Sequence, residues 1–543
     1  MAGGRDVLDP RARLMLAFDG RELPPTMARR LAEGPIAGIT LFRFLNVDTP
    51  AQVRELTASV QRAASSFDAA APGPVLIAAD QEGGQLVALG EGTTPFPGAM
   101  ALGAVGDAAL AERVGHATGL ELLAMGVNTA YAPSCDLADN PANPHIGIRS
   151  FGSDPEAVAM LAAATVRGLR SAGVASGGKH FPGLGGSALD THHELGVVPH
   201  DRARLEAAEL LPFRAAIEAG ADLVMSAHLA LPALTGDPTL PATLSRAVMH
   251  DLVRDELGFG GLTITDALDM GALPQGDAQV IDVIAAIRAG VDLLLCTADP
   301  VAQARIEGGL LHAAARGLFD PAEMQASAGR LAALRRRLAE VAQAPLDVVR
   351  SAAHEALARE VAERSVTLVR DDDRRLPLRL PADARVVVVQ PVGRDLTPAD
   401  TSSTVRPHLA DAIGRRYRGV EAIVVDEAND EQIAGARGRV AGADLLVLGT
   451  VSASMRPSHA ALSNALLATG VPAVTVALRT PFDLTAYPSS TTHVCGYGIL
   501  EPSCEAVAAA LFGEIPFAGR LPAPIAGLYP VGHGLTNAPT REH

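Results

Sequence analysis

The chain has few cysteines and few aromatic residues. Its 543 residues include no tryptophan, 3% aromatic residues and four cysteines. Cys135, Cys296, Cys495 and Cys504 form no CxxC pair, which argues against a zinc site and against a redox dithiol. The core must therefore be built mainly from alanine, valine, leucine and isoleucine.

A basic cluster and a long apolar run are also missing. The formal net charge is −16, so nucleic acids and anionic membranes are poor partners. No apolar run approaches the ~18 residues of a membrane-spanning helix. Residues 1–20 carry charges inside their only short apolar run, which is unlike a secretory signal. We therefore expect a soluble cytoplasmic protein with reduced thiols.

Motifs for bound cofactors are absent too. The histidines at 180, 192, 193 and 228 lack the i, i+4 spacing and the HExxH context of a helical zinc site. No GxGxxG follows a strand-like run, and there is no P-loop, so nucleotide binding has no local support. We expect neither a metal nor a cofactor.

What the first ~300 residues do contain is an alternation of short apolar runs and helical patterns. Strand followed by helix, repeated, predicts parallel pairing with right-handed crossovers, and eight such units predict a (β/α)₈ TIM-type barrel. The expected strands lie at 14–18, 38–42, 74–79, 128–133, 174–180, 222–228, 262–266 and 291–296.

A second α/β pattern follows a charged helical stretch at 322–369. Its apolar runs are continuous and rich in valine, which is typical of parallel strands covered on both faces. We expect these strands at 384–393, 421–426, 443–450, 471–478 and 492–498. The predicted organisation is a barrel at 1–340, a helical connector at 341–360 and a three-layer αβα sandwich at 361–543.

Ionisable residues gather where the barrel strands are expected to end. Function in such barrels resides at the carboxyl ends of the strands and in the loops that follow them. Asp80 ends the third strand, Lys179 and His180 the fifth, His228 the sixth and Asp266 the seventh, and Arg149 lies in the long loop after the fourth.

One stretch, KHFPGLGGSALDTHH at 179–193, holds five ionisable groups around a pliable, glycine-rich middle. A carboxylate beside an imidazole fixes its tautomer and stabilises its protonated form, so Asp190 makes His192 a candidate proton donor and acceptor. A surface turn with incidental histidines is the alternative. Asp266, after an apolar strand, is a candidate nucleophile, and its alternative is a helix N-cap.

KHFPGLGGSALDTH matches the pattern K-H-[FI]-P-G-[HL]-G-x4-D-[ST]-H. In this it resembles the β-N-acetylglucosaminidase branch of glycoside hydrolase family 3. AADQEGG, NPANPHIGIRSFG and TDALDMGAL resemble other signature segments of that family in the same order. RSVTLVRDDDRRLPL and FAGRLPAPI resemble its C-terminal sandwich domain, so the resemblance covers nearly the whole chain.

The resemblance implies a role for each matching position. Asp266 matches the nucleophile that forms a covalent glycosyl-enzyme, and Asp190 with His192 matches a dyad whose histidine is the general acid/base on a mobile loop. The implied hinge is Gly183, Gly185 and Gly186. Asp80, Arg149, Lys179 and His180 match residues that hold sugar hydroxyls, and we add His228 to this substrate-binding set.

Two positions depart from the family pattern. The family often has arginine after DQEGG and a second basic residue three positions later, whereas this chain has Gln85 and Ala88. His193 directly follows His192, and only the motif register assigns the proton to His192. The preference for GlcNAc is therefore less firmly implied than the chemistry.

The function that the resemblance implies is a retaining exo-β-N-acetylglucosaminidase, acting by double displacement on cell-wall or chitin-derived fragments and so serving peptidoglycan recycling. Its partner is a small GlcNAc-containing glycoside, and the oligomeric state is not readable. The alternatives are a phosphorylase, in which phosphate replaces water, a broad β-glucosidase, and a non-catalytic sugar-binding protein.

Overall fold

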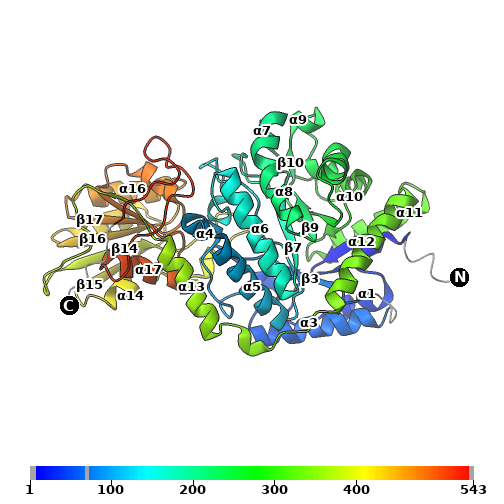
Figure 1. Ribbon diagram of the computed structural model, residues 1–543, viewed down its shortest axis with the longest axis horizontal. Helices are drawn as coiled ribbons and strands as arrows, with labels where there is room; N and C mark the ends of the chain where they lie inside the picture. The colour runs from blue at the N-terminus through cyan, green and yellow to red at the C-terminus, as the bar shows by residue number, and fades with distance from the viewer. Residues whose placement is uncertain (1–7, 68–72, 537–543) are drawn as a thin grey trace.

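Two large sheets organise the residues that the computed structural model describes, 8–67 and 73–536. The outer ends of the first and third predicted domains, residues 1–7 and 537–543, lie outside this described part. One sheet closes into a barrel and the other is open (Figure 1). The two lie side by side along the long axis of the molecule, with helix α13 (Ala352–Ser365) between them.

The barrel has the predicted (β/α)₈ form. All of its strand pairs are parallel, in the order β11-β9-β7-β6-β3-β2-β1-β12, and a bridge from Ile264 to Leu293 closes the ring. Each predicted run overlaps one observed strand, and β7 extends one residue beyond its predicted end at 180. These strands are Leu14–Leu16 (β1), Gly38–Thr40 (β2), Leu76–Ala79 (β3), Thr129–Ala130 (β6), Ala175–Phe181 (β7), Leu223–Ser226 (β9), Leu262–Thr265 (β11) and Leu294–Leu295 (β12).

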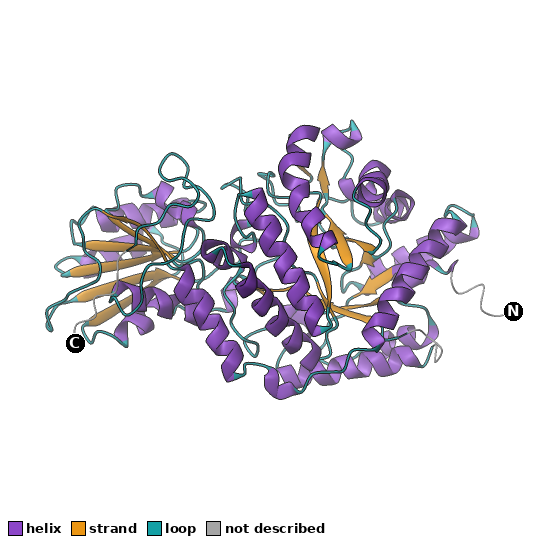
Figure 2. Cartoon of the chain, in the orientation of Figure 1, coloured by secondary structure: helices purple, strands orange, loops and turns teal. Residues whose placement is uncertain are grey.

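Helices surround the barrel strands (Figure 2). Several begin with an aspartate whose carboxylate accepts backbone N–H groups, followed by proline in the first turn, as at Asp154, Asp299 and Asp320. The α-helices are Pro25–Glu33 (α1), Arg43–Asn46 (α2), Pro50–Ser65 (α3), Ala99–Val105 (α4), Ala108–Ala124 (α5), Pro155–Ala172 (α6), Arg202–Arg204 (α7), Leu210–Glu218 (α8), Pro232–Thr235 (α9), Ala278–Ala289 (α10), Pro300–Ala315 (α11) and Pro321–Ala339 (α12), and a π-helix, Ala247–Glu256, lies between β9 and β11.

The second sheet is covered on both faces, as the continuous valine runs predict. In β14, Val386 and Val388 join the core with α14 and α17, whereas Val387 and Val389 pack with α15 and α16. Alternate residues of one strand thus serve two helix layers. The elements are Val386–Pro391 (β14), Leu409–Gly414 (α14), Val420–Val425 (β15), Asp430–Val440 (α15), Leu445–Thr450 (β16), Pro457–Leu467 (α16), Ala473–Ala477 (β17), Thr492–Cys495 (β18) and Glu501–Leu511 (α17).

One strand of this sheet contradicts the sequence prediction. The predicted helical stretch extends to Val369, but α13 ends at Ser365 and Thr367–Asp371 form β13, antiparallel to β18 at the edge of the sheet. Thr367, Leu368 and Val369 are buried, and their apolar and β-branched side chains favour the extended form once the helix has ended.

One hydrophobic cluster extends from the barrel into the sandwich. It lies between the barrel strands and the surrounding helices, and it continues through Phe482, Leu484, Tyr487 and Tyr497 of the second half of the chain. Helix α13 contacts α4 of the barrel and α17 of the sandwich. It includes residue 360, where we predict the end of the connector, and the predicted domain boundaries stay a prediction. Within the described residues, no helix is both long and apolar enough to cross a membrane.

Candidate active site

A cavity of about 590 Å³ opens at the rim where the barrel strands end. Its volume is in the range of small-molecule binding sites. Six of the eight residues proposed from the sequence for catalysis or sugar binding line it: Asp80, Arg149, Lys179, His180, His192 and Asp266. The parallel register brings these positions together because Lys179 and His180 lie at the carboxyl end of β7 and the others follow a strand or lie in the loop after one.

A buried ion cluster holds one side of the cavity. The Lys179 ammonium contacts the Asp80 carboxylate and lies 2.6 Å from Glu82 Oε1. Arg149 Nε and Nη2 each donate to Glu82 over 2.9 Å, a bidentate pairing. Burial opposes ionisation of Glu82, but Arg149 and Lys179 hold its pKa well below the usual range. The two cations are therefore fixed, and Asp80, which is still partly accessible, faces the cavity.

Glu82 was not among the residues that sequence reasoning selected. It lies in the short strand Gln81–Gly83 (β4), which pairs with Leu86–Val87 (β5) in a hairpin after β3. Its position in the sequence, past the end of β3, does not by itself mark it as a residue of the site. The available signal was electrostatic, because a buried lysine and a buried arginine need more counter-charge than Asp80 alone provides.

A second omitted carboxylate, Asp136, orients His180. Asp136 Oδ2 lies 2.6 Å from His180 Nδ1, and Oδ1 accepts from the Leu184 backbone N–H over 2.6 Å. Asp136 is fully buried, which disfavours its charge, yet His180 and these donors lower its pKa. One carboxylate thus fixes both the ring that faces the cavity and the start of the glycine-rich loop.

The structure separates the two adjacent histidines of that loop. His192 Nδ1 lies 2.7 Å from Asp190 Oδ1, and the ring lines the cavity. The His193 side chain is 72% exposed, against 15% for His192, and lies 3.7 Å from Asp190. Burial raises the pKa of Asp190, but His145, whose Nδ1 lies 3.5 Å from Oδ1, and the hydrogen bonds from His192 outweigh it and lower the pKa well below its usual value.

His145, a third residue that the sequence reasoning omitted, packs between the histidines of the site. Its ring centroid lies 4.8 Å from that of His192 and 5.2 Å from that of His180. Burial, reinforced by the nearby Arg149 charge, lowers its pKa to about 3, so the ring is neutral at physiological pH. It supports His192 by packing without adding a charge.

Asp266 lies at the end of β11. Its backbone N–H donates to the Ser226 carbonyl over 3.2 Å, and Oδ1 accepts from the Ala267 N–H over 2.8 Å. The next helix, α10, begins only at Ala278, so the alternative reading of Asp266 as a helix N-cap is wrong. Burial raises its pKa, but the surrounding histidines, His180 foremost, lower it to about 2. The carboxylate is therefore ionised at neutral pH.

His228 occupies a different place from the one expected. It is fully buried behind Asp266 and is not among the residues that line the cavity. Nδ1 lies 2.8 Å from Thr243 Oγ1, and Nε2 lies 3.1 Å from the Ala267 carbonyl oxygen. With both ring nitrogens engaged by the protein, His228 is placed to support the backbone next to Asp266.

The sandwich contributes one wall of the cavity. Pro398, Ala399 and Thr401 line it, from the loop after β14. Thr401 donates through both its N–H and its hydroxyl to the Gln85 carbonyl, over 2.8 and 2.9 Å. Gln85 itself is buried and lies outside the cavity lining, whereas Ala88 lines it.

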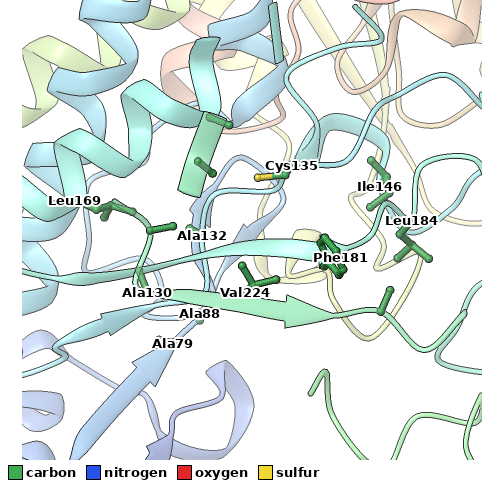
Figure 3. Packing of buried hydrophobic residues seen from close by; sticks show 14 of the residues in the cluster. Ala79, Ala88, Ala130, Ala132, Cys135, Ile146, Leu169, Phe181, Leu184 and Val224 are labelled. Atoms are coloured by element: carbon green, nitrogen blue, oxygen red, sulfur yellow. The ribbon is translucent and has the colours of Figure 1, made fainter. Parts of the chain in front are cut away.

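The glycine-rich run packs closely in this conformation. A Cβ on Gly185 would approach the Leu137 carbonyl oxygen to 1.9 Å, and Gly183 has φ +125°. Figure 3 shows Phe181 and Leu184 of this run near Ile146, in the apolar layer beside the site. The hinge role of these glycines stays a prediction.

Potential metal ligands converge at three places in the described residues: His145, Asp190 and His192; Asp139, His200 and Glu209; His250, Asp251 and Asp255. In the first set the Asp190–His192 pairing already uses ligand atoms, and in the second Arg204 binds both carboxylates. The expected absence of a metal stays a prediction.

Comparison with known proteins gives the class of the molecule. Residues 16–334, more than half of the chain, match the model of the glycosyl hydrolase family 3 N-terminal domain. The chain belongs to this family, as the sequence resemblance implies.

Two relatives of the chain are named β-hexosaminidases. The chain is 38% identical over 288 residues to β-hexosaminidase A of Pseudoalteromonas piscicida, a match that covers 50% of this chain and 48% of that protein. It is 36% identical over 293 residues to a β-hexosaminidase of Nitrosomonas eutropha, covering 53% and 81%. The first match thus spans about half of that relative, and both matches cover about half of this chain.

Solved structures resemble nearly the whole chain. A family 3 β-N-acetylglucosaminidase from Paenibacillus sp. str. FPU-7 superposes with a TM-score of 0.90 at 36% identity, covering 95% of this chain and 98% of that one. A fungal multi-domain family 3 β-N-acetylglucosaminidase gives a TM-score of 0.89 at 30% identity, covering 97% and 61%. A β-glucoside phosphorylase at 23% identity shares the fold, with a TM-score of 0.78.

Proposed function

We propose that the protein is a retaining exo-β-N-acetylglucosaminidase that removes terminal β-linked GlcNAc by double displacement. The observation that carries this proposal is the arrangement within one cavity of an ionised Asp266 and of His192, whose ring is held by Asp190. The names of its relatives, β-hexosaminidase and β-N-acetylglucosaminidase, support the same substrate class.

In the first step, the Asp266 carboxylate attacks the anomeric carbon while His192 donates a proton to the departing glycosidic oxygen. Asp190 receives the hydrogen bond of His192 Nδ1, which directs Nε2 toward the leaving group and stabilises the imidazolium. After the transfer His192 is neutral, Asp266 carries the sugar as an ester, and the aglycone leaves as an alcohol.

In the second step, neutral His192 accepts a proton from water as the water oxygen attacks the same anomeric carbon. The ester bond to Asp266 breaks, the carboxylate is restored, and the product keeps the β configuration because two inversions have occurred. Proton transfer of this kind contributes about 10²–10⁴ in rate.

Sugar recognition is assigned to the ion cluster. Asp80 presents a carboxylate to the cavity, and His180, Lys179 and Arg149 present donors whose positions Asp136 and Glu82 fix. Because these charges are already paired, a sugar hydroxyl meets oriented groups and little rearrangement is needed on binding. We assign His228 to supporting Asp266.

Phosphorolysis is the second candidate. An imidazole acid/base becomes neutral after donating its proton, so it carries no negative charge that would repel an incoming phosphate. The same residues are compatible with water and with phosphate as the acceptor of the sugar, so hydrolysis and phosphorolysis differ only in the product.

The test is product identity from p-nitrophenyl β-N-acetylglucosaminide and the matching glucoside, each with and without phosphate. Free GlcNAc under both conditions, with little glucoside cleavage, is the expected result. GlcNAc 1-phosphate would establish a phosphorylase, and preferential glucoside cleavage a β-glucosidase. No product from either sugar would overturn the enzymatic proposal and leave a sugar-binding protein.

We further propose that the enzyme acts in the cytoplasm on fragments recovered from the cell wall. All four cysteines are buried and unpaired, which fits a reducing compartment. Fractionation of cells, with activity assayed in the cytoplasmic and extracytoplasmic fractions, tests this location.

A further inference from the structure

Arg43 lies where the active-site cavity meets a second cavity of about 220 Å³, and it lines both. It is the first residue of the short helix α2, which follows β2. Asn46 fixes this segment, because its Oδ1 accepts from the Phe42 N–H over 2.9 Å and its Nδ2 donates to the Phe18 carbonyl over 2.8 Å. The backbone that carries Arg43 is therefore anchored to the barrel.

The Arg43 guanidinium has no hydrogen-bond or ion-pair partner among the described residues, although it is half-buried. The other two cations of the active-site cavity, Arg149 and Lys179, are tied to Glu82. Arg43 rests against Gly90, where a Cβ would lie 2.2 Å from Nη1. Glycine at 90 thus makes room for a guanidinium that pairs with no carboxylate among the described residues.

The second cavity lies between the barrel and the sandwich, and charged groups of both signs line it. Arg350 and Arg406 line it, paired with Glu355 and Asp411, and so does His408, whose Nδ1 is buried without a partner. Two carboxylates, Glu91 and Glu501, lie on the same lining. With those pairs balanced, Arg43 and the open His408 nitrogen are the groups available to an incoming ligand.

We propose that Arg43 and this second cavity form a subsite for an acidic group, a carboxylate or a phosphate, carried by the sugar substrate. The inference rests on the proposed function and selects acidic fragments over neutral chitin-derived ones. The planar guanidinium matches both anions through paired N–H donors.

Two pairs of substrates test the subsite, each matched in shape and different in charge. GlcNAc-β-1,4-MurNAc and its lactyl methyl ester place the carboxylate on the leaving sugar. The 6-phosphate of p-nitrophenyl β-N-acetylglucosaminide and its unphosphorylated form place the charge on the transferred sugar. In at least one pair we expect the acidic member to have about tenfold higher kcat/KM at low salt.

Arg43→Gln should bring that ratio close to one, and Arg43→Lys, which keeps the charge without the fork, should give an intermediate ratio. Arg316→Gln removes an exposed charge at the end of α11 and should leave the ratio unchanged. The pair that responds identifies which sugar carries the acidic group. A ratio near one in both pairs for the unmodified enzyme, or a ratio unchanged by Arg43→Gln, would overturn the subsite.

Failure of the proposed function would look different. In that case the neutral members would not be cleaved by the unmodified enzyme. Calorimetric titration would then compare GlcNAc 6-phosphate and the lactyl acid with their neutral partners, on the unmodified protein and on Arg43→Gln. Tighter binding of an acid that is lost in the variant supports the subsite, and equal binding of both members in each pair rejects it.

Discussion

At the scale of single residues, the adjacent pair His192 and His193 shows how the loop assigns its chemistry. Both rings lie within 4 Å of Asp190, but His193 extends into solvent, whereas His192 lies within the cavity against His145. Burial and packing therefore single out one imidazole, and the two positions form a matched experimental pair.

His192→Ala should reduce kcat/KM for chitobiose by about 10²–10⁴, because its alkoxide leaving group needs a proton. The 2,4-dinitrophenyl glycoside, whose leaving group departs as a stable anion, should lose less than about tenfold by the same principle. His193→Ala is the control and should change neither. Equal losses on both substrates would assign His192 a structural role.

Asp266→Ala should reduce turnover by on the order of 10³–10⁶, as loss of a nucleophile does in other covalent mechanisms. Steady-state assays and calorimetric Tm measure the two consequences, and the Tm should stay within a few degrees. Asp277→Ala, at a fully exposed carboxylate, is the control. Substantial residual turnover would remove Asp266 from its proposed role.

Glu82→Gln should lower the free energy of unfolding at pH 7 by about 3–5 kcal/mol, because it leaves Arg149 and Lys179 short of counter-charge. The pKa of Glu82 is lower in the folded than in the unfolded protein, so its contribution is present above about pH 4.5 and is lost as pH falls below it. The difference between variant and parent should therefore shrink in acid.

Urea unfolding at pH 7 and at pH 4 and below measures this difference. Glu112→Gln, in an exposed pair with Arg167, should change stability by at most about 1 kcal/mol. A difference for Glu82→Gln that grows as pH falls would contradict the assignment of its charge.

The sequence reveals some of these residues and hides others for a physical reason. Asp80, His180 and Asp266 stand out because an ionisable group at the carboxyl end of an apolar strand is exceptional. Asp136 and His145 lie inside a long polar loop, where such residues are common, and their roles arise only from burial against His180 and His192.

At the scale of elements, the β4–β5 hairpin is where a loop of the sandwich is hydrogen-bonded to the rim of the barrel. Thr401 donates to Gln85 and accepts from the Val87 N–H over 3.2 Å. The preceding residue, Asp400, pairs with the buried Arg479 of the sandwich, so the loop is held from both sides.

Thr401→Val keeps the shape of the side chain but removes these hydroxyl hydrogen bonds. Each is worth about 0.5–1.5 kcal/mol, so we expect KM to rise about two- to tenfold with a smaller change in kcat. Initial-rate kinetics provide the measurement. Ser403→Ala removes an exposed hydroxyl that bonds Asp395 and should leave KM unchanged. An unchanged KM in Thr401→Val would show that the wall does not contact the sugar.

Element prediction succeeds where local pattern and tertiary environment agree. The apolar runs of β14 and β16 are buried on both faces of the sheet, so the continuous apolar pattern matches their environment. Strand β13 was missed because it follows α13 without a turn signal, and only pairing with β18 makes it a strand. The loop at 395–404 carries no sign in its sequence that it lines a cavity of another domain.

At the scale of the whole molecule, the shared core predicts that barrel and sandwich unfold together. Phe482, Tyr487 and Tyr497 cannot leave the common cluster without exposing apolar surface of the barrel. We expect a single transition in calorimetry and in the near-ultraviolet circular dichroism of tyrosine. Saturating GlcNAc should shift the whole unfolding transition to higher temperature. Two transitions, with only one moved by the sugar, would mean that the halves are independent.

The wall formed by Pro398, Ala399 and Thr401 also bears on how the enzyme would degrade a long polysaccharide. A rim closed on that side receives a chain end and does not let a strand lie across it. Digestion of a polymer would then release sugar at a rate set by the number of chain ends, while the viscosity of the solution falls little until most of the material has been consumed.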